Sequence, residues 1–174
     1  MPAAVFFDRD GVLCRAQMVD GRPRAPLSLQ EFQLEPDAQA AVQAVTAAGL
    51  LAVVVTNQPE LATGELQPSV LEAIHRSLQA EVDVTAIYVC PHQANAGCLC
   101  HKPKPGLLER ASVELDVNLG ASFMIGDRWR DVGAGQAVGC RTVLIERPYS
   151  GVCRPDHRAR SLGEAVAWVL GSNR

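Results

Sequence analysis

The sequence predicts an α/β fold in which a mostly parallel sheet lies between two layers of helices. Short apolar runs alternate along the chain with segments of helical periodicity. This pattern is typical of parallel strands connected by helical crossovers. The chain has 174 residues, enough for one domain with a real core and too few for two ordinary domains. We therefore expect residues 1–174 to form a single three-layer, Rossmann-like domain.

Five apolar runs are predicted to be the strands. They are rich in β-branched, aromatic and aliphatic residues and are bounded by turn-forming residues. The runs are 4–7, 51–55, 85–89, 122–125 and 142–145.

Four segments have apolar residues at helical spacing. The first is opened by Glu35-Pro36-Asp37 and is stopped by Gly49. The second follows Pro68, and the third follows Pro105, which suits the first position of a helix. The fourth covers 162–169 and closes the chain. Most of these apolar faces are expected to be core.

The composition disfavours several kinds of partner. Charged residues make up 20% of the chain, the net charge is -3, and no basic stripe is present, so nucleic acid is not an expected ligand. No apolar run approaches the length of a membrane span, and no secretory leader is recognisable. We therefore expect a soluble, cytoplasmic monomer whose six cysteines are thiols or metal ligands.

Two carboxylates follow the first strand. Asp8 and Asp10 come directly after the run 4–7, and Gly11 is predicted to turn the chain. Open α/β sheets bind ligands at the carboxyl ends of their strands. One carboxylate can attack a phosphorus or carbon atom while the other transfers protons, with a metal ion screening their repulsion. The alternative is an Asp-rich turn that caps the next element.

Two further strands end in polar residues. Thr56 and Asn57 follow the second strand, where a hydroxyl and backbone N–H groups can bind phosphate oxygens, although a Thr-Asn turn is also commonplace. Asp127 follows the fourth strand, and Arg128 and Asp131 come shortly after it. Arg128 is a candidate phosphate ligand. These side chains should share one edge of the sheet with the first two carboxylates.

Lys102 supplies a positive charge for the same site. It lies in the segment 101–106, directly before the third helix. A lysine in this position can neutralise a phosphoryl group and a nucleophilic aspartate together. The alternative is a solvated surface lysine, which we expect Lys104 to be.

Taken in order, these segments resemble the four motifs of the haloacid-dehalogenase (HAD) superfamily of phosphotransferases. Asp8-Arg9-Asp10-Gly11-Val12 matches the first motif, and Thr56-Asn57 matches the second. Lys102 matches the third, and Gly126-Asp127 with Asp131 matches the fourth. The match extends over nearly the whole chain.

The resemblance implies a mechanism and a metal ion. In this family the first aspartate becomes an aspartyl phosphate, and the second is the general acid and later the general base. Carried over, Asp8 attacks and Asp10 protonates the leaving oxygen. Asp8, the backbone carbonyl of Asp10 and Asp127 would hold Mg²⁺. Asp131 would orient water around the metal or act at a helix N-terminus.

The spacing of the motifs leaves no room for a folded cap. Members of the superfamily with a large cap carry it after the first motif or between the second and the third. Here one helix takes up most of the first gap, and a helix, a strand and a cysteine loop take up the second. The polar stretch 13–33 is predicted to be a long loop or flap near the end of the first strand. We therefore expect a capless protein with an open active site.

A cysteine-rich loop precedes the motif lysine. Four potential zinc ligands lie within eleven residues, namely Cys90, His92, Cys98 and Cys100. They suit one tetrahedral Zn²⁺, which would be structural because four protein ligands complete its coordination sphere. A disulfide pair or a redox-sensing thiol cluster is the alternative. Cys14, Cys140 and Cys153 are expected to be ordinary thiols.

The same loop resembles the branch of the superfamily that contains the heptose-bisphosphate and histidinol-phosphate phosphatases. In the heptose enzymes an arginine usually occupies the position of His101 and contributes to substrate recognition. A tyrosine-bearing segment usual after the first motif is also absent here. We expect His101 to contact the substrate.

These resemblances imply a Mg²⁺-dependent phosphomonoesterase that acts on a small phosphorylated sugar or amino alcohol. The expected substrate is D-glycero-D-manno-heptose 1,7-bisphosphate, which would lose its 7-phosphate. Histidinol phosphate is the alternative, favoured if its imidazole requires an acidic partner such as Glu60. A non-enzymatic zinc-binding interaction module and a nucleic-acid end-processing phosphatase are the rival classes.

Overall fold

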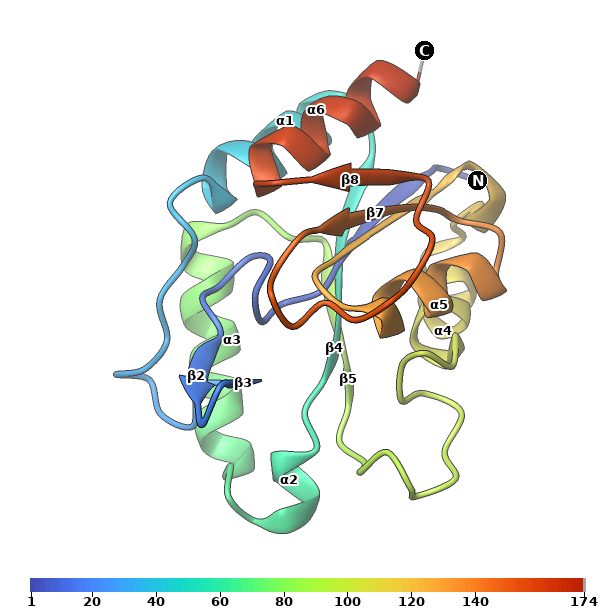
Figure 1. Cartoon of the computed structure of the whole chain (residues 1–174). Helices are drawn as coiled ribbons and strands as arrows, with labels where there is room; N and C mark the ends of the chain where they lie inside the picture. Colours follow the sequence, from blue (N-terminus) through green and yellow to red (C-terminus); the bar gives the residue numbers. More distant parts are fainter. Residues whose placement is uncertain (174) are drawn as a thin grey trace.

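The computed structural model describes residues 1–173, which form a six-stranded sheet and six α-helices (Figure 1). The strand order is β5-β4-β1-β6-β7-β8, and every neighbouring pair is parallel. The strands are β1 (Ala4–Phe7), β4 (Leu51–Asn57), β5 (Ala86–Cys90), β6 (Phe123–Gly126), β7 (Arg141–Ile145) and β8 (His157–Ala159). The predicted parallel α/β fold is confirmed.

Helices cover both faces of the sheet. One layer contains α1 (Ala38–Ala47), α3 (Pro68–Glu81) and α6 (Leu162–Ser172), and the other contains α4 (Gly106–Leu115) and α5 (Trp129–Ala137). Alternate residues of β1 enter opposite cores. Val5 and Phe7 pack with the first layer, whereas Ala4 and Phe6 pack with the second. All four are fully buried, which explains why this strand is a continuous apolar run.

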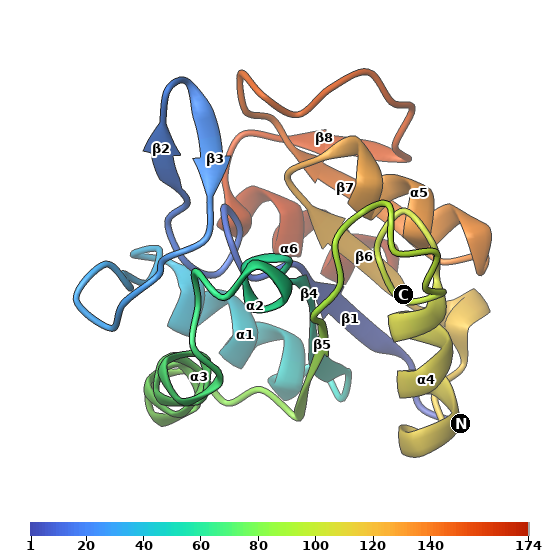
Figure 2. The ribbon, with the colours of Figure 1, turned by 90° about the horizontal axis from the view of Figure 1, so that it is seen from below.

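The chain reverses direction across the sheet next to β1. It runs from β1 outward to β4 and β5, then returns to β6 on the other side of β1 (Figure 2). Ligands of open α/β sheets bind at such a switch point, beyond the carboxyl ends of the strands. Asp8 follows β1 and Asp127 follows β6. The topology therefore brings two of the predicted carboxylates to one edge.

The strand boundaries differ slightly from the prediction at this edge. β4 extends through Thr56 and Asn57, which pair with the last two residues of β5. The polar pair therefore lies within the strand and not in a turn after it. At the opposite end of the sheet, β6 begins one residue later than predicted; the Ser122 hydroxyl before it accepts from the backbone N–H of Ala4 and donates to the carbonyl of Asn118.

The four predicted helices are confirmed, with one change of boundary. α4 begins at Gly106, so Pro105 is the N-cap and not the first helical residue. Two α-helices were not predicted. α2 (Glu60–Thr63) is a single turn, and α5 has two glycines and only one buried branched residue, Val132, so its periodicity is weak. A 3₁₀ turn, η1 (Leu119–Ala121), precedes β6.

The predicted loop 13–33 contains a β-hairpin. β2 (Gln17–Val19) and β3 (Arg22–Arg24) are antiparallel and are joined by Asp20 and Gly21, which have φ values of 49° and 72°. The hairpin is consistent with the predicted flap, but its two strands were not predicted, because each has only three residues and shows no apolar alternation. As predicted, the hairpin lies near the edge where the strands of the sheet have their carboxyl ends, here called the functional edge. There the carbonyl of Pro23 accepts a hydrogen bond from Arg128 Nη2 (3.4 Å).

None of the helices formed by residues 1–173 has the length and hydrophobicity needed to cross a bilayer.

Candidate active site

A buried lysine lies at the centre of the functional edge. The Lys102 ammonium is 3.0 Å from Asp8 Oδ1 and 2.6 Å from Asp131 Oδ1, and it donates to the carbonyl of Val55 at 2.8 Å. Only 2% of the lysine is exposed. Burial alone would lower the pKa of Lys102, but the two carboxylates outweigh this effect and raise it, so the side chain remains charged.

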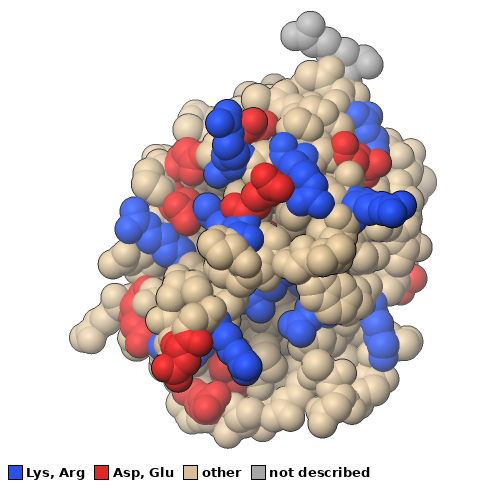
Figure 3. Space-filling view, in the orientation of Figure 1, with Lys and Arg blue, Asp and Glu red and all other residues tan. Residues whose placement is uncertain are grey.

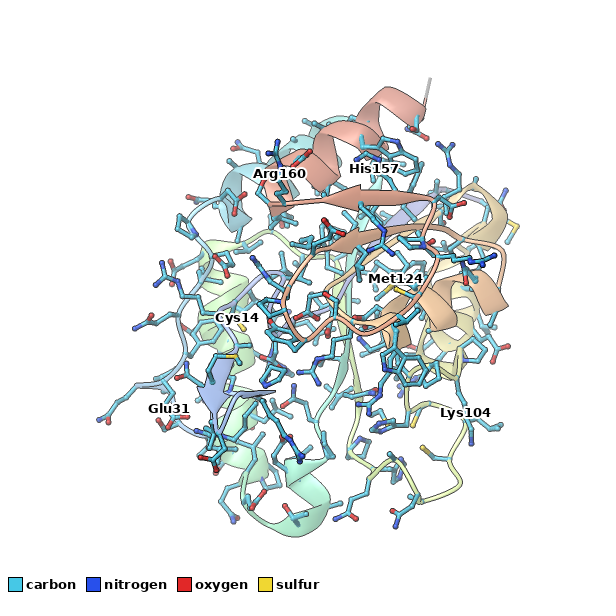
Figure 4. All side chains as sticks on the ribbon, viewed as in Figure 1. Cys14, Glu31, Lys104, Met124, His157 and Arg160 are labelled. Carbon is cyan, nitrogen blue, oxygen red and sulfur yellow. The ribbon has the colours of Figure 1, made fainter. Side chains whose placement is uncertain are left out.

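Asn57 positions the segment that carries Lys102. Its Oδ1 accepts from the backbone N–H of Lys102 (3.1 Å), and its Nδ2 donates to the Lys102 carbonyl (3.2 Å). The end of β4 is thereby joined to the loop before α4. Thr56 is fully buried, and its hydroxyl oxygen accepts from Gln58 Nε2 (2.9 Å). Lys104, by contrast, is exposed as predicted and lies at the margin of the molecule (Figure 4).

The two carboxylate oxygens of Asp8 have different surroundings. Oδ1 accepts from the backbone N–H of Arg9 (2.8 Å) and faces the Lys102 ammonium. No hydrogen bond or ion pair within residues 1–173 occupies Oδ2. Burial raises the pKa of Asp8 to about 6, against the opposing charge of Lys102. Asp8 is therefore held in place through one oxygen while the other remains available.

Asp127 is fully buried beside Asp8; its carboxylate lies next to the Tyr149 hydroxyl, and neither of its oxygens has a well-formed hydrogen bond among residues 1–173. Gly11, with φ of 88°, makes room for this carboxylate, because a Cβ at that position would overlap it. Burial and then the negative charges of Asp8 and Asp131 raise the pKa of Asp127 well above its usual value. An unpaired buried carboxylate is stabilised by a cation.

Asp131 accepts two hydrogen bonds. Its Oδ1 faces Lys102, and its Oδ2 accepts from the backbone N–H of Arg128 (3.0 Å), at the start of α5. The helix N-terminal role considered for this residue is therefore observed, and the ion pair with Lys102 was not anticipated. Gly126 permits the contact, because a Cβ there would overlap the Asp131 carboxyl group.

Asp10 is bound by Arg9, a residue without a predicted role. The fully buried guanidinium donates from Nε to Asp10 Oδ1 (2.9 Å) and from Nη2 to Oδ2 (3.1 Å), while Nη1 lies 3.0 Å from His75 Nε2 on α3. Gln58 Nε2 (2.8 Å) and the thiol of Cys14 (3.2 Å) also donate to Asp10. Burial would raise the pKa of Asp10, but Arg9 and these donors lower it.

The edge opens into a pocket of about 90 Å³. Among the predicted site residues, it is lined by Asp8, Asp10, Asn57, His101, Lys102 and Arg128. Thr56 does not line the pocket. Glu60 and Arg130 also line the pocket, and Arg130 had not been recognised because α5 was not predicted. Basic side chains surround a hollow on this face (Figure 3).

His101 lies at the boundary between the pocket and the cysteine loop. It is 7% exposed, and its Nδ1 lies 2.9 Å from the carbonyl of His92. Because a carbonyl can only accept, Nδ1 carries a proton, and in the neutral ring Nε2 is an acceptor. Nε2 is buried and has no partner within residues 1–173.

The cysteine loop gathers the four predicted zinc ligands. Their ligand atoms all lie within 4.8 Å of one another. The Sγ atom of Cys90 is 3.1 Å from that of Cys100 and 3.8 Å from that of Cys98, and His92 Nδ1 is 3.4 Å from the sulfur of Cys100. Sulfurs around tetrahedral zinc are separated by about 3.8 Å when each Zn–S bond is about 2.3 Å. All six cysteines are free, so no disulfide is formed here.

Known phosphatases resemble this chain in sequence and in structure. Residues 99–170 match a family model described as HAD-hydrolase-like. The chain is 35% identical over 147 residues to the D-glycero-β-D-manno-heptose-1,7-bisphosphate 7-phosphatase of Pseudomonas aeruginosa, covering 82% of this chain and 80% of that one. It is 35% identical over 158 residues to the same enzyme of Pasteurella multocida, with coverages of 84% and 83%.

A similar solved structure is that of the D,D-heptose 1,7-bisphosphate phosphatase of Bordetella bronchiseptica, complexed with magnesium and phosphate. It has a TM-score of 0.84 and 29% sequence identity, and the match covers 98% of this chain and 99% of that one. The similarity therefore extends over both the sheet and the loops at its functional edge.

The ion pair between Lys102 and Asp131 generates a stability prediction. We expect Asp131→Asn to lower the free energy of unfolding by roughly 3 kcal/mol, because a buried ammonium loses one of its two charged partners. Glu114→Gln is the matched control, since it removes one charge from an exposed pair with Arg110 and should change stability little. Urea unfolding at neutral pH measures both. Equal small effects would contradict a stabilising role for the buried pair.

Proposed function

Because this chain belongs to the HAD-like hydrolases and is a phosphatase of that family, we propose that it hydrolyses its substrate through an aspartyl phosphate on Asp8. One observation carries the proposal. The free oxygen of Asp8, the ammonium of Lys102 and the unpaired oxygens of Asp127 converge at the switch point of the sheet. Such a site combines a nucleophile with the positive charge that a phosphoryl group requires.

In the first step, Asp8 Oδ2 attacks the phosphorus atom and the bond from phosphorus to the ester oxygen breaks. Lys102, already held against Oδ1, neutralises charge on both the nucleophile and the phosphoryl oxygens. Asp10 gives its proton to the leaving oxygen. In the second step, water attacks the phosphorus of the aspartyl phosphate and gives a proton to Asp10, while the bond between phosphorus and the Asp8 oxygen breaks, so that phosphate leaves and the Asp8 carboxylate is restored.

The contacts of Asp10 favour its role in the second step. Arg9 and Gln58 stabilise its charged form and lower its pKa, which suits a group that receives a proton from water. A phosphate ester brought next to Asp10 adds negative charge, which raises the pKa of the carboxyl group. Asp10 can then hold the proton that the leaving oxygen requires.

The residues present fit a magnesium ion. Asp8 and Asp127 offer carboxylate oxygens, and both oxygens of Asp127 are buried without partners, as is appropriate for ligands of a hard cation. The backbone carbonyl of Asp10 is the proposed third ligand. Bound Mg²⁺ would screen the repulsion between these carboxylates and the phosphate. Asp131 is less suited to the inner sphere, because both of its oxygens accept hydrogen bonds.

We further propose that Cys90, His92, Cys98 and Cys100 hold a structural Zn²⁺. The four ligand atoms lie within 4.8 Å of one another, and the separation of 3.8 Å between the Cys90 and Cys98 sulfurs is that expected around tetrahedral zinc. The zinc would brace the loop that carries His101 and Lys102, and it would take no part in the reaction.

The proposed substrate is a phosphorylated sugar of the heptose type, D-glycero-D-manno-heptose 1,7-bisphosphate. The relatives that support it are heptose-1,7-bisphosphate 7-phosphatases. Histidinol phosphate remains the second candidate, because Glu60 lines the pocket with one buried carboxylate oxygen that lacks a partner within residues 1–173. That oxygen could accept from an imidazole or an amine, or equally from a sugar hydroxyl.

Asp8→Asn tests the function most simply. We expect it to abolish phosphate release from a panel containing heptose 1,7-bisphosphate and histidinol phosphate, because an amide cannot form the acyl phosphate. Asp83→Asn, at an exposed position, is the control and should retain activity. Phosphate release is measured with Mg²⁺ present, and folding is checked by thermal unfolding. Substantial turnover by folded Asp8→Asn protein would disprove the nucleophile.

Metal analysis tests the zinc site. Protein purified without chelators should contain close to one zinc ion per chain, and Cys98→Ser should lose it. Cys153→Ser removes a thiol outside the cluster and should retain the metal. We also expect Cys98→Ser to unfold at a lower temperature than Cys153→Ser, because structural zinc contributes to folding. Zinc-free protein of unchanged stability would contradict the assignment.

A further inference from the structure

The orientation of the Asp10 carboxylate depends on the fully buried guanidinium of Arg9. Nε of Arg9 donates to Asp10 Oδ1 at 2.9 Å, and Nη2 donates to Oδ2 at 3.1 Å. Such a bidentate pair fixes the plane of a carboxylate as well as its position. The other donors to Asp10 within residues 1–173, Gln58 and Cys14, each contact a single oxygen. Arg9 is therefore the partner that sets how Asp10 faces the pocket.

His75 on α3 in turn holds the guanidinium of Arg9. Its Nε2 lies 3.0 Å from Arg9 Nη1, the terminal nitrogen that does not bind Asp10. Because a guanidinium can only donate, Nε2 accepts this hydrogen bond, and the neutral ring carries its proton on Nδ1. Burial and the positive charge of Arg9 lower the pKa of His75 to about 4, so the ring is neutral at neutral pH.

This contact is more than packing of the helix. The buried face of α3 consists of Leu71, Ile74 and Leu78, and His75 is a half-buried residue beside that face. An apolar side chain of similar size would cover the same surface. It would leave Nη1 of a fully buried arginine without the acceptor that His75 provides, and a buried charged donor without a partner is costly.

The reaction is sensitive to the position of Asp10. A general acid or base must lie within hydrogen-bond reach of the atom that gains or loses the proton. A displacement of about 1 Å can slow a reaction by roughly 10²-fold. If the guanidinium of Arg9 rotated to find a new acceptor for Nη1, its two bonds to Asp10 would be disturbed. The carboxylate would then lose the orientation that proton transfer requires.

We propose that His75 is a positioning residue for Asp10 and acts on it through Arg9. His75 does not line the pocket, so it affects the reaction only through the arginine. The inference rests on the proposed function, in which Asp10 transfers protons in both steps. It adds to the site a residue of α3, far from the strand ends that carry the other functional groups.

His75→Leu tests the proposal in single-turnover experiments with p-nitrophenyl phosphate and Mg²⁺. Nitrophenolate leaves without a proton, so its release should stay within about twofold of wild type. Phosphate release should slow by roughly tenfold or more, because water must give its proton to Asp10 in the second step. For the most active sugar phosphate, whose leaving oxygen needs a proton, kcat should fall by a similar factor with KM little changed.

Two further variants separate positioning from general damage. His75→Gln offers an amide oxygen in place of Nε2 and should recover most of the rate of phosphate release. His157→Leu is the matched control, because this half-buried histidine on β8 stacks on Trp168 outside the pocket. It should leave both releases unchanged. Thermal unfolding checks that each variant is folded.

A double variant tests whether the effect passes through Arg9. Arg9→Lys keeps the positive charge but loses the planar fork, so it should also slow phosphate release. Adding His75→Leu to Arg9→Lys should then cause little further loss, because the two residues act as one unit. Losses that multiply in the folded double variant would contradict the proposed relay.

The remaining outcomes are decisive in the same way. Folded His75→Leu protein that releases nitrophenolate and phosphate at rates within about twofold of wild type, or that slows both equally, would overturn the inference. Turnover by Asp8→Asn protein would instead refute the aspartyl phosphate. Nitrogen NMR of the His75 ring needs no substrate, and we expect a proton on Nδ1 and none on Nε2. A ring protonated on Nε2 would overturn the inference for any substrate.

Discussion

The ammonium of Lys102 is the interaction on which the active-site edge depends. It lies between Asp8, which follows β1, and Asp131 in α5, and it also donates to Val55 in β4. A buried charge of this kind is tolerated only when its partners are correctly placed, since an unpaired one costs several kcal/mol. The ends of two strands and the start of a helix are therefore constrained together by one side chain. Asn57 adds to this constraint by holding the backbone on both sides of Lys102.

The positions of the charged side chains around the pocket match the proposed reaction. Arg9 binds Asp10 from within the core, while Lys102 binds Asp8. Asp127 is buried and fits a cation, whereas the basic side chains that line the pocket fit phosphate groups. A magnesium ion and a substrate with two phosphates would complete both sets. The charged side chains of the pocket thus indicate that its ligands would be a cation and phosphate groups.

Local patterns predicted five of the six strands of the sheet, four of the six α-helices and the residues of the motifs, but not the edge strand β8, which has only three residues. Asp8 was recognisable because a buried strand ends in it, and the zinc ligands because they lie close together in the sequence. The pairing of Arg9 with Asp10 was not, since it occurs with the guanidinium fully buried and near His75, 66 residues away, and such burial is decided by tertiary packing. Arg130 was missed together with α5, whose glycines weaken helical periodicity. Sequence patterns indicate which groups are present, but their pairing is decided by tertiary contacts.

A trapped phosphoenzyme would test the central claim most directly. Protein mixed with Mg²⁺ and the bisphosphate is quenched in acid within the first turnover, digested, and mapped by mass spectrometry. We predict a phosphoryl group on Asp8 that is absent from Asp8→Asn protein, because the carboxylate oxygen that Lys102 leaves free is the nucleophile. A phosphoryl group on another residue, or rapid hydrolysis without any phosphoenzyme, would contradict it.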